Sequence, residues 1–320
     1  MHENDYPLTA TVIHAIGCTF AAARRPISAI HANLFEEDSA VVVDFHTHLF
    51  PRFVRENRER WFADEPAFEL LYAHPKARLA SAGDIIAAMD AQQVDLAVVF
   101  GFPWRCLETA KRHNDYIMEA VNRYPDRLMG FCCLDPCAEK APREVARCFE
   151  GGLCGVGELA FYECGIACTI RDNMAPVMAL CREHDKPVLI HTNEPVGHRY
   201  AGKTDNTLIQ IYELAKAYPL NHIVLAHWGG GLFFYQLLKK EVGSVLANVY
   251  FDTAASPFLY KPSIYRYAVE LAGCEKILFG SDYPLINPRR YFAELEISGL
   301  HQDQIDAIKG GNALKLLARE

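Results

Sequence analysis

The sequence predicts an α/β fold, namely a (β/α)8 barrel (TIM barrel) formed as a single domain with an N-terminal extension. Three observations favour this fold. The chain has 320 residues, enough for the roughly 250 that such a barrel uses. Short apolar runs alternate with amphipathic segments, as in repeated βα units. Several of these runs end in histidine, aspartate or glutamate, and barrel active sites form at the carboxyl ends of the strands.

The composition is that of a globular enzyme. Hydrophobic residues make up 51% of the chain and charged residues 22%, and the formal net charge is −8 at pH 7. Because no basic run occurs, we expect no nucleic-acid partner. No apolar stretch approaches the roughly 18 residues that span a bilayer, so we expect no membrane partner. The 11 cysteines form no CxxC pair and no secretory signal is evident, which favours reduced thiols and a cytoplasmic location.

Residues 1–40 do not fit the barrel pattern. The run at 21–26 is faintly like a targeting segment, but the acidic residues Glu3, Asp5 and Glu36 are wrong for one. We therefore interpret residues 1–40 as an N-terminal extension, either partly disordered or lying on the barrel surface, and assign it no function. The barrel itself is predicted over residues 41–320.

The first predicted strand carries two histidines. The β-branched run 41–43 indicates a buried parallel strand, which continues through Asp44 to His46 and His48. Because side chains alternate along a strand, the two histidines point the same way. Two imidazoles at a strand's carboxyl end, closed by Pro51, suit a metal such as zinc. For this pair alone, two ordinary loop histidines are the alternative.

Residues 52–80 form a long insertion after the first strand. They are rich in aromatic and charged side chains, such as Trp61 and Tyr72. A segment just past the carboxyl end of a strand lies over the mouth of a barrel, so we predict a lid. Ser81 then introduces an amphipathic helix at residues 85–90.

The remaining elements alternate regularly. Apolar runs bounded by turn residues indicate strands, and longer amphipathic segments indicate helices. The predicted strands are 94–101, 128–134, 153–159, 187–191, 221–227, 247–252 and 276–282. The predicted helices are 106–123, 141–150, 174–185, 205–217, a segment from Gly229 to about Glu241, 262–272 and 312–317.

Three other interpretations are weaker. A doubly wound open sheet lacks support because no GxGxxG motif follows the first strand. Gly229, Gly230 and Gly231 could cradle a phosphate, but no P-loop lysine accompanies them, so we predict only a tight turn. Ser281 stands in no GxSxG elbow, which argues against a Ser-His-Asp triad.

Five predicted strands end in residues that bind metals or transfer protons. In a barrel these strand ends meet around one site. Each residue alone is compatible with a buried structural role, but all of them at equivalent positions indicate a common site. Asp252, at the end of another strand, is expected to support it. The candidate ligands and proton-transfer residues are His46, His48, Glu158, His191, His227 and Asp282.

Polar residues near the predicted mouth are candidates for substrate binding. The loop at 191–203 is long and polar, and its basic residues suit a carboxylate or phosphate. Charges that are merely solvated are the alternative. Trp104, Arg105, Arg289 and Arg290 are similar candidates in other loops. The predicted substrate-binding residues are His198, Arg199, Tyr200, Lys203 and Trp228.

Four motifs at these strand ends resemble those of one superfamily. They are DFHTH at 44–48, LIH at 189–191, LAHWGG at 225–230 and FGSDYP at 279–284. With the closing segment 311–317, they make the chain similar to the amidohydrolase superfamily over about residues 41–318. More narrowly, the chain resembles the amidohydrolase-related family that includes aminocarboxymuconate semialdehyde decarboxylase. The motifs are specific for the superfamily and poorly specific for the reaction.

The resemblance implies a metal-dependent enzyme acting on a small molecule. His46, His48, His191 and Asp282 would hold one divalent ion, zinc above all, with Mn²⁺ or Fe²⁺ as alternatives. In members with one metal, His227 would transfer a proton or polarise the substrate. In a hydrolase, Asp282 would take the proton of a metal-activated water and His227 would bind the developing oxyanion. Family members often form dimers, so a homodimer is compatible with the resemblance.

Glu158 departs from the pattern of the family's decarboxylases. It looks instead like the strand-4 glutamate of superfamily members with two metals, where it bridges both ions. His191 and His227 would then bind the second ion, and a bridging hydroxide would attack a carbonyl or phosphoryl centre. The alternative is that Glu158 only orients a ligand histidine.

The main prediction is therefore a metal-dependent hydrolase of a small amide, lactone or ester, acting through metal-activated water. The first alternative is a non-oxidative, zinc-dependent decarboxylase of a small carboxylic acid, which is favoured where Glu158 does not bind metal. The second is a barrel that binds a ligand without turnover. The presence of both His227 and Asp282 disfavours this last interpretation.

Overall fold

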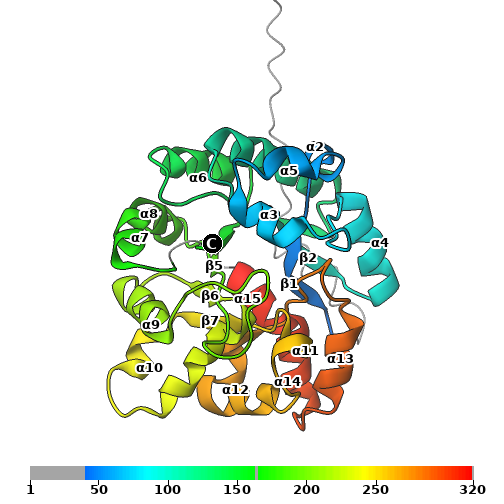
Figure 1. The fold of residues 1–320 in the computed structure, drawn as a ribbon. Helices are drawn as coiled ribbons and strands as arrows, with labels where there is room; N and C mark the ends of the chain where they lie inside the picture. The colour runs from blue at the N-terminus through cyan, green and yellow to red at the C-terminus, as the bar shows by residue number, and fades with distance from the viewer. Residues whose placement is uncertain (1–39, 163–164, 319–320) are drawn as a thin grey trace, which may run out of the picture.

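Eight parallel strands form a barrel inside a ring of helices (Figure 1). The structure, a computed structural model, describes residues 40–162 and 165–318. The strands pair in chain order, and hydrogen bonds from Phe45 N to Phe279 O and from His48 N to Tyr283 O, each 2.8 Å, join the last strand region to the first. The predicted (β/α)8 barrel is confirmed. The predicted extension lies, apart from residue 40, outside the described residues.

The elements follow the predicted alternation. The strands are β1 (Val43–His48), β2 (Leu96–Phe100), β3 (Leu128–Cys132), β4 (Gly155–Leu159), β5 (Val188–Ile190), β6 (Ile223–Leu225), β7 (Val249–Asp252) and β8 (Ile277–Leu278). The α-helices are α2 (Arg52–Arg55), α3 (Pro66–Tyr72), α4 (Ala82–Gln92), α5 (Leu107–Arg123), α6 (Ala141–Glu150), α7 (Cys168–Asn173), α8 (Ala175–Glu183), α9 (Leu208–Ala217), α10 (Val242–Val245), α11 (Ser256–Leu259), α12 (Ile264–Ala272), α13 (Arg289–Glu296), α14 (Gln302–Asp306) and α15 (Asn312–Leu317). Short turns of other helix types are η1 (Arg58–Trp61), η2 (His227–Leu237), η3 (Cys274–Lys276) and η4 (Ala307–Gly311). Within the described ranges, none of these helices is both long and apolar enough to span a bilayer.

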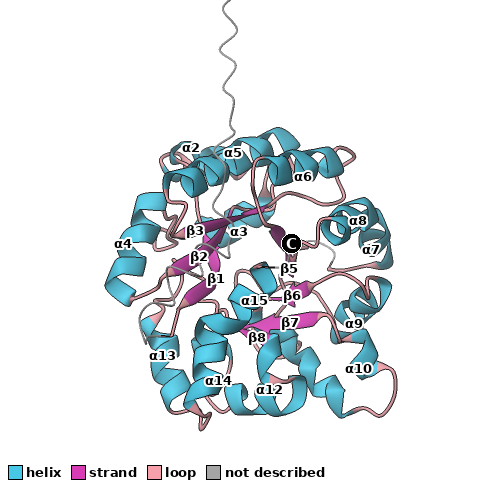
Figure 2. Ribbon diagram, turned by 180° about the vertical axis from the view of Figure 1, so that it is seen from behind, coloured by secondary structure: helices cyan, strands magenta, loops and turns pink. Residues whose placement is uncertain are grey.

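Two apolar layers stabilise the barrel. One fills its interior, where Val43 and Phe45 of β1 are fully buried with side chains of the other strands. The other lies between the strands and the surrounding helices. Leu314 and Leu316 of α15 belong to the interior layer together with Val41, which precedes β1. This helix therefore closes the amino-terminal end of the barrel, and both ribbon views place it near the centre of the ring of helices (Figures 1 and 2).

The eighth strand is shorter than predicted. The sequence indicated a strand over 276–282, whereas β8 ends at Leu278. The residues that follow leave the ladder because their backbone groups bond to β1 instead: Asp282 N donates to His46 O at 2.9 Å, and Tyr283 O accepts from His48 N. This departure turns Asp282 toward the histidines of β1.

A left-handed turn follows β6. Trp228, Gly229, Gly230 and Gly231 have φ values of 62°, 61°, 62° and 91°, which glycine adopts most readily. A Cβ at Gly230 would lie only 2.3 Å from Asn193 O. The predicted tight turn is confirmed, but the helix predicted to continue to Glu241 is wrong. The segment is instead a short 3₁₀ region that ends at Leu237.

A buried histidine ties the end of β1 to α5. His113 is 1% exposed, its Nε2 donates to Leu49 O at 2.6 Å, and its Nδ1 accepts from Trp104 Nε1 at 2.8 Å. Trp104, a predicted substrate contact, is fully buried in this packing. Because Nδ1 already faces an N–H group, a second proton on the ring has no acceptor, and burial lowers the pKa of His113 to about 4.

This histidine makes stability depend on pH. Between the ordinary pKa of 6.5 and the folded value of about 4, the unfolded chain binds a proton that the folded chain rejects, so stability falls as pH falls. At pH 5 the loss from this group is about 2 kcal/mol relative to pH 7.5. We expect His113→Gln to lower the melting temperature at pH 7.5. Between pH 7.5 and pH 5, however, the variant should lose less stability than the wild type. Calorimetry of both proteins checks this, and parallel losses would contradict it.

Candidate metal centre

An irregularity in β1 aims its two histidines into the barrel. Asp44 pairs with Ala97 of β2 and Thr47 with Val99, so β1 has one more residue than β2 between these pairs. Such a β-bulge reverses the alternation of side chains along the strand. As a result Phe45 fills the interior core while His46 and His48, above it, also face inward. The predicted common direction of the two histidines follows from this geometry.

A second bulge places Glu158. Val156 of β4 pairs with Val188 of β5, and Leu159 with Ile190, so β4 also carries one extra residue. Gly157 lies in this irregularity with φ 138°, and a Cβ there would lie 2.4 Å from Leu189 O. Only glycine fits this position, because the conformation and the space both exclude a side chain.

The ligand-type side chains converge at the carboxyl end of the barrel. His46 Nε2 lies 3.3 Å from His48 Nε2, and Asp282 Oδ1 lies 3.2 Å from His48 Nε2 and 3.8 Å from His46 Nε2. Two imidazole nitrogens bound to one tetrahedral ion, each at 2.0–2.1 Å, stand roughly 3.4 Å apart. His46, His48 and Asp282 therefore have the spacing of three ligands of one cation. Glu158 and His227 form a second compact group with His46.

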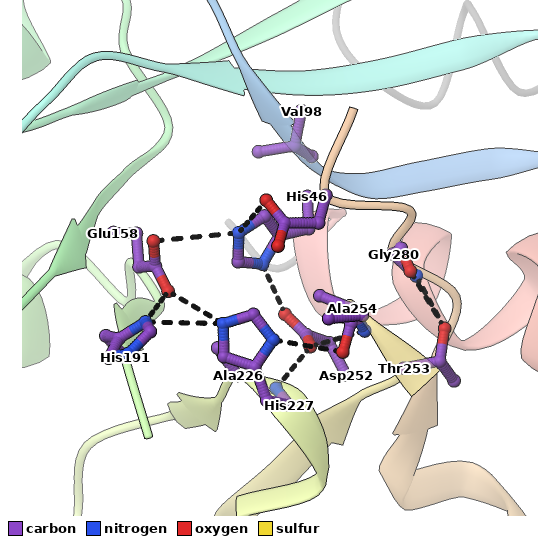
Figure 3. Close-up of polar contacts among 12 residues, drawn as sticks. His46, Val98, Glu158, His191, Ala226, His227, Asp252, Thr253, Ala254 and Gly280 are labelled. Carbon is purple, nitrogen blue, oxygen red and sulfur yellow. Dashed lines mark hydrogen bonds and ion pairs between the residues drawn. The ribbon is translucent and has the colours of Figure 1, made fainter. Parts of the chain in front are cut away.

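Glu158 stands between the imidazoles. Its Oε1 lies 2.9 Å from His191 Nδ1 and 3.6 Å from His227 Nε2, and its Oε2 lies 3.6 Å from His46 Nε2 (Figure 3). Oε2 also lies 3.7 Å from His48 Nε2. His191 thus reaches the site next to Glu158 but belongs to neither compact group of three. The structure brings all six predicted ligand and proton-transfer residues into one cluster.

Hydrogen bonds from outside the cluster orient three of its imidazoles. Nδ1 of His46 donates to Asp252 Oδ2 at 2.8 Å, and Nδ1 of His227 donates to Ala254 O at 3.0 Å. Nε2 of His191 donates to Gly202 O at 2.8 Å. Because each of these partners accepts only, the other ring nitrogen faces the cluster and is free to bind a metal or carry a proton.

Asp252 has the supporting role expected from the sequence. Besides holding His46, its Oδ1 accepts from His227 N at 2.9 Å and from Ala254 N at 3.0 Å (Figure 3). One fully buried carboxylate therefore fixes residues of β1 and of the segment after β6. This arrangement matches that of carboxylates that orient metal-binding histidines.

The electrostatics of the cluster favour a cation at its centre. Burial opposes the charge of Glu158, but the imidazoles of His46 and His191 hold its pKa well below the ordinary value. Burial likewise opposes a proton on His46, yet Glu158 and Asp252 raise its pKa well above the ordinary value. The pKa of Asp282 is also lowered, because the neighbouring histidines outweigh its burial. A divalent ion satisfies the same groups that otherwise attract protons, so the residues fit a metal.

A cavity of about 480 Å³ leads to this cluster. Its floor contains His48, Glu158, His191, His227 and Asp282. Its walls include aromatic rings of the insertion and of the β2 and β4 loops. The aromatic lining residues are Tyr72, Phe102, Tyr162, Tyr200 and Phe258.

The insertion at 52–80 lies over this cavity, as predicted. It folds into α2, η1 and α3, and Leu71, Tyr72 and Arg78 line the cavity. Arg78 also spans to the β8 loop, donating to Pro284 O at 3.4 Å and Tyr283 OH at 3.3 Å. Arg78 and Phe102 were missed in the sequence, because nothing in a lone arginine or phenylalanine indicates that it faces a cavity.

The predicted substrate-binding residues divide into two groups. His198 and Tyr200 line the cavity. The remaining three do not. Arg199 is exposed and pairs with Asp205 at 2.7 Å, and Lys203 pairs with Glu194 at 2.8 Å. Trp228 is fully buried away from the cavity, because its left-handed backbone turns the ring outward onto Tyr265 and its Nε1 donates to Ser256 Oγ.

The chain belongs to the amidohydrolase family, which its sequence matches over residues 43–319. It is therefore an enzyme of the amidohydrolase superfamily. The resemblance identified from the strand-end motifs is confirmed, including its narrower placement with the family of aminocarboxymuconate semialdehyde decarboxylase.

Three similar proteins bear the name of a decarboxylase. A gamma-resorcylate decarboxylase from Polaromonas sp. strain JS666 is 26% identical in an alignment of 262 positions, and the match covers 66% of this chain and 77% of that protein. The structure of 5-carboxyvanillate decarboxylase from Sphingomonas paucimobilis has a TM-score of 0.71 at 17% identity, covering 88% of this chain and 100% of that one. A dihydroxybenzoic acid decarboxylase from Polaromonas sp. JS666, solved with manganese and 2-nitroresorcinol, has a TM-score of 0.63 at 20% identity, covering 87% and 97%. At these identities the structural matches show the fold alone.

The predicted hydrolase activity is wrong, because the similar proteins are decarboxylases. The prediction rested on Glu158 as a bridging ligand. Glu158 does lie at the centre of the cluster, but a central carboxylate attracts a cation whichever bond the enzyme breaks. Its position therefore indicates where a cation would bind and does not distinguish the two reactions.

Proposed function

We propose that this enzyme is a metal-dependent, non-oxidative decarboxylase of a small aromatic acid with a hydroxyl group next to the carboxylate. The observation that carries the proposal is the aromatic cavity that leads to a buried cluster of histidines and carboxylates. The gamma-resorcylate decarboxylase of Polaromonas supports the same substrate class.

The cavity walls suit a flat ring. Phe102 and Tyr162 lie nearly parallel, with an interplanar angle of 9° and centroids 6.4 Å apart, and Tyr72 stands edge-on to Phe102. Aromatic walls bind a benzoate ring by stacking and by excluding water. Arg78 and His198 in the cavity lining supply hydrogen-bond donors, and in the case of Arg78 a positive charge, for an anionic substrate.

The proposed reaction needs no external oxidant or reductant. A proton adds to the ring carbon that bears the carboxylate. The bond between that carbon and the carboxylate carbon then breaks, its electron pair returns to the ring, and CO₂ leaves. A neighbouring hydroxyl increases the electron density at the protonated carbon. The protein must therefore deliver one proton to the ring and hold the carboxylate and hydroxyl oxygens.

His227 and Asp282 are the proposed proton-transfer pair. Both line the cavity, and His227 Nε2 faces the cluster because Nδ1 is bonded to Ala254 O. Burial lowers the pKa of His227, but the hydrogen bond to Glu158 and the charge of Asp282 raise it to about 8 in the metal-free protein. The ring can then hold a proton at Nε2 near neutral pH, next to a carboxylate that can exchange it.

His46, His48, His191 and Asp282 are proposed to hold the divalent metal, with Glu158 beside them. When bound, the metal supplies a positive charge for the substrate oxygens and stabilises the negative charge that develops on them. The donor set of imidazoles and carboxylates suits either manganese or zinc. Asp252 and Ala254 keep the ring nitrogens of His46 and His227 pointed at this position.

The proposal is tested with manganese-loaded protein and 2,6-dihydroxybenzoate in D₂O. We expect CO₂ to be released and one deuterium to appear at the ring carbon that carried the carboxylate, as measured by mass spectrometry and NMR. The 3,5-dihydroxy isomer, which has no hydroxyl beside the carboxylate, is the control and should react far more slowly. Protein that binds manganese but releases no CO₂ from any 2-hydroxybenzoate tested would overturn the proposal.

A further inference from the structure

One buried carboxylate joins the two chain segments that carry His46, His48 and Asp282. Asp44 is 2% exposed. Its Oδ1 accepts from Ser281 N at 2.8 Å and from His46 N at 3.2 Å, and its Oδ2 accepts from Ser281 Oγ at 2.5 Å. Asp44 and Ser281 are 237 positions apart in sequence, so these bonds connect β1 directly to the turn after β8.

On the β1 side, the carboxylate stabilises the bulge. The extra residue of a bulge interrupts the ladder, and a buried N–H that loses its ladder partner needs another acceptor. Asp44 supplies that acceptor to His46 N within the irregular stretch between Asp44 and Thr47. The same bulge turns the His46 side chain toward the cluster, so Asp44 supports the direction of this ligand.

On the β8 side, the carboxylate anchors a strained turn. Asp282 has φ 60°, a conformation that residues other than glycine adopt reluctantly. The residue before it is held at three points: Ser281 bonds to Asp44 through both N and Oγ, and its carbonyl accepts from Tyr291 OH at 2.6 Å. Ser281 Oγ also accepts from Tyr283 N at 3.1 Å. These bonds fix the backbone on both sides of Asp282, whose Oδ1 lies 3.2 Å from His48 Nε2.

We propose that Asp44, acting through Ser281, is the positioning residue that holds His46, His48 and Asp282 at ligand distance from one another. Ser281 is fully buried and its hydroxyl is committed to Asp44. Ser281 thus links Asp44 to the backbone of Asp282. Because its hydroxyl is bonded to Asp44, Ser281 does not act as a nucleophile. The inference rests on the proposed metal centre and is independent of the reaction that the metal serves.

The test measures metal affinity of the full-length chain. The protein is stripped with a chelator and titrated with MnCl₂ in a calorimeter. We expect Ser281→Ala to weaken manganese binding about 10- to 100-fold, as for other groups that orient metal ligands. Asp44→Asn, which keeps one acceptor oxygen, is expected to weaken binding in the same direction. Because the two changes break the same contact, their effects should not add. The double variant should bind manganese with the affinity of whichever single variant binds it more weakly.

Ser298→Ala is the matched control. Ser298 is 6% exposed, its Oγ donates to Leu295 O at 2.6 Å, and it accepts from Leu300 N at 3.3 Å, two residues on, as Ser281 Oγ does from Tyr283 N. This serine contacts no candidate ligand through these bonds. Its removal should lower the melting temperature as Ser281→Ala does while leaving manganese affinity unchanged.

Three outcomes overturn the inference. They are a folded Ser281→Ala protein with wild-type manganese affinity, an equal loss of affinity in Ser298→Ala, and a wild-type chain that binds no manganese. Where Asp44→Asn does not fold, Ser281→Ala decides alone. Failure of the decarboxylation assay with manganese affinities as expected would refute the proposed reaction and leave the positioning role standing.

Discussion

His227→Asn is expected to reduce decarboxylation about 10²- to 10⁴-fold, the usual contribution of a proton-transfer group. Asparagine keeps an N–H near the position of Nδ1, which donates to Ala254 O, and removes Nε2, which faces the cluster. The fold should therefore persist while proton delivery fails. Steady-state kinetics with manganese-loaded protein measures the loss in kcat.

Metal analysis of the same variant separates the two roles proposed for this histidine. With a single metal bound by His46, His48, His191 and Asp282, manganese content per chain should equal that of the wild type. A decrease by one ion per chain would make His227 a ligand of a second metal. Wild-type kcat at full metal content would show that His227 takes no part in proton transfer.

Gly157→Ala is expected to have the largest structural effect. The residue has φ 138°, and an added Cβ would lie 2.4 Å from Leu189 O and 2.7 Å from Leu189 Cβ. The disfavoured conformation costs about 1–3 kcal/mol, and the clash with the backbone of β5 adds to it. The next residue is Glu158, so we expect lower stability together with weaker manganese binding. Thermal melting and metal titration measure the two effects.

Gly299→Ala is the control for backbone strain. Gly299 has φ 82°, and a Cβ there meets no heavy atom within 4 Å. It lies between α13 and α14, outside the strands. This variant should lose stability without losing manganese affinity. Similar losses of affinity in both variants would show that the effect at Gly157 is general destabilisation and is unrelated to Glu158.

The barrel and the location of its site were predictable from local sequence. Each strand is an apolar run of a few residues, and its carboxyl end is visible as the point where a polar residue follows. The positions of Glu158, His191 and His227 follow from that rule together with the parallel order of the strands. The motif around Asp282 was recognisable even though β8 is only Ile277–Leu278.

Contacts between distant segments were not predictable. The role of Asp44 depends on Ser281, 237 positions away, and a single aspartate in a strand gives no indication of such a partner. Arg78 and Phe102 line the cavity only because the insertion folds back over the barrel. Trp228 was predicted to face the substrate because it follows β6, but its left-handed backbone turns it into the packing against Tyr265.

The error about the reaction has a different origin. Glu158 lies in the cluster, as the sequence indicated, and its oxygens lie between the two pairs of histidines. The wrong step was to infer from the set of metal ligands which bond the enzyme breaks. Stabilising negative charge on oxygen serves hydrolysis and decarboxylation alike.

The bulges in β1 and β4 separate two layers of the barrel: a lower layer of packed apolar side chains and an upper layer that forms the site. Below the bulge in β1, Val43 and Phe45 belong to the interior apolar layer; above the bulges, His46 and Glu158 belong to the cluster of ligand-type side chains. In a strand without the extra residue, the directions of the side chains in the two layers would depend on each other. A change of strand register that improved the packing would then turn a ligand away from the site. Side chains of the lower layer can therefore be substituted, in the laboratory or during evolution, while the residues of the upper layer keep their geometry.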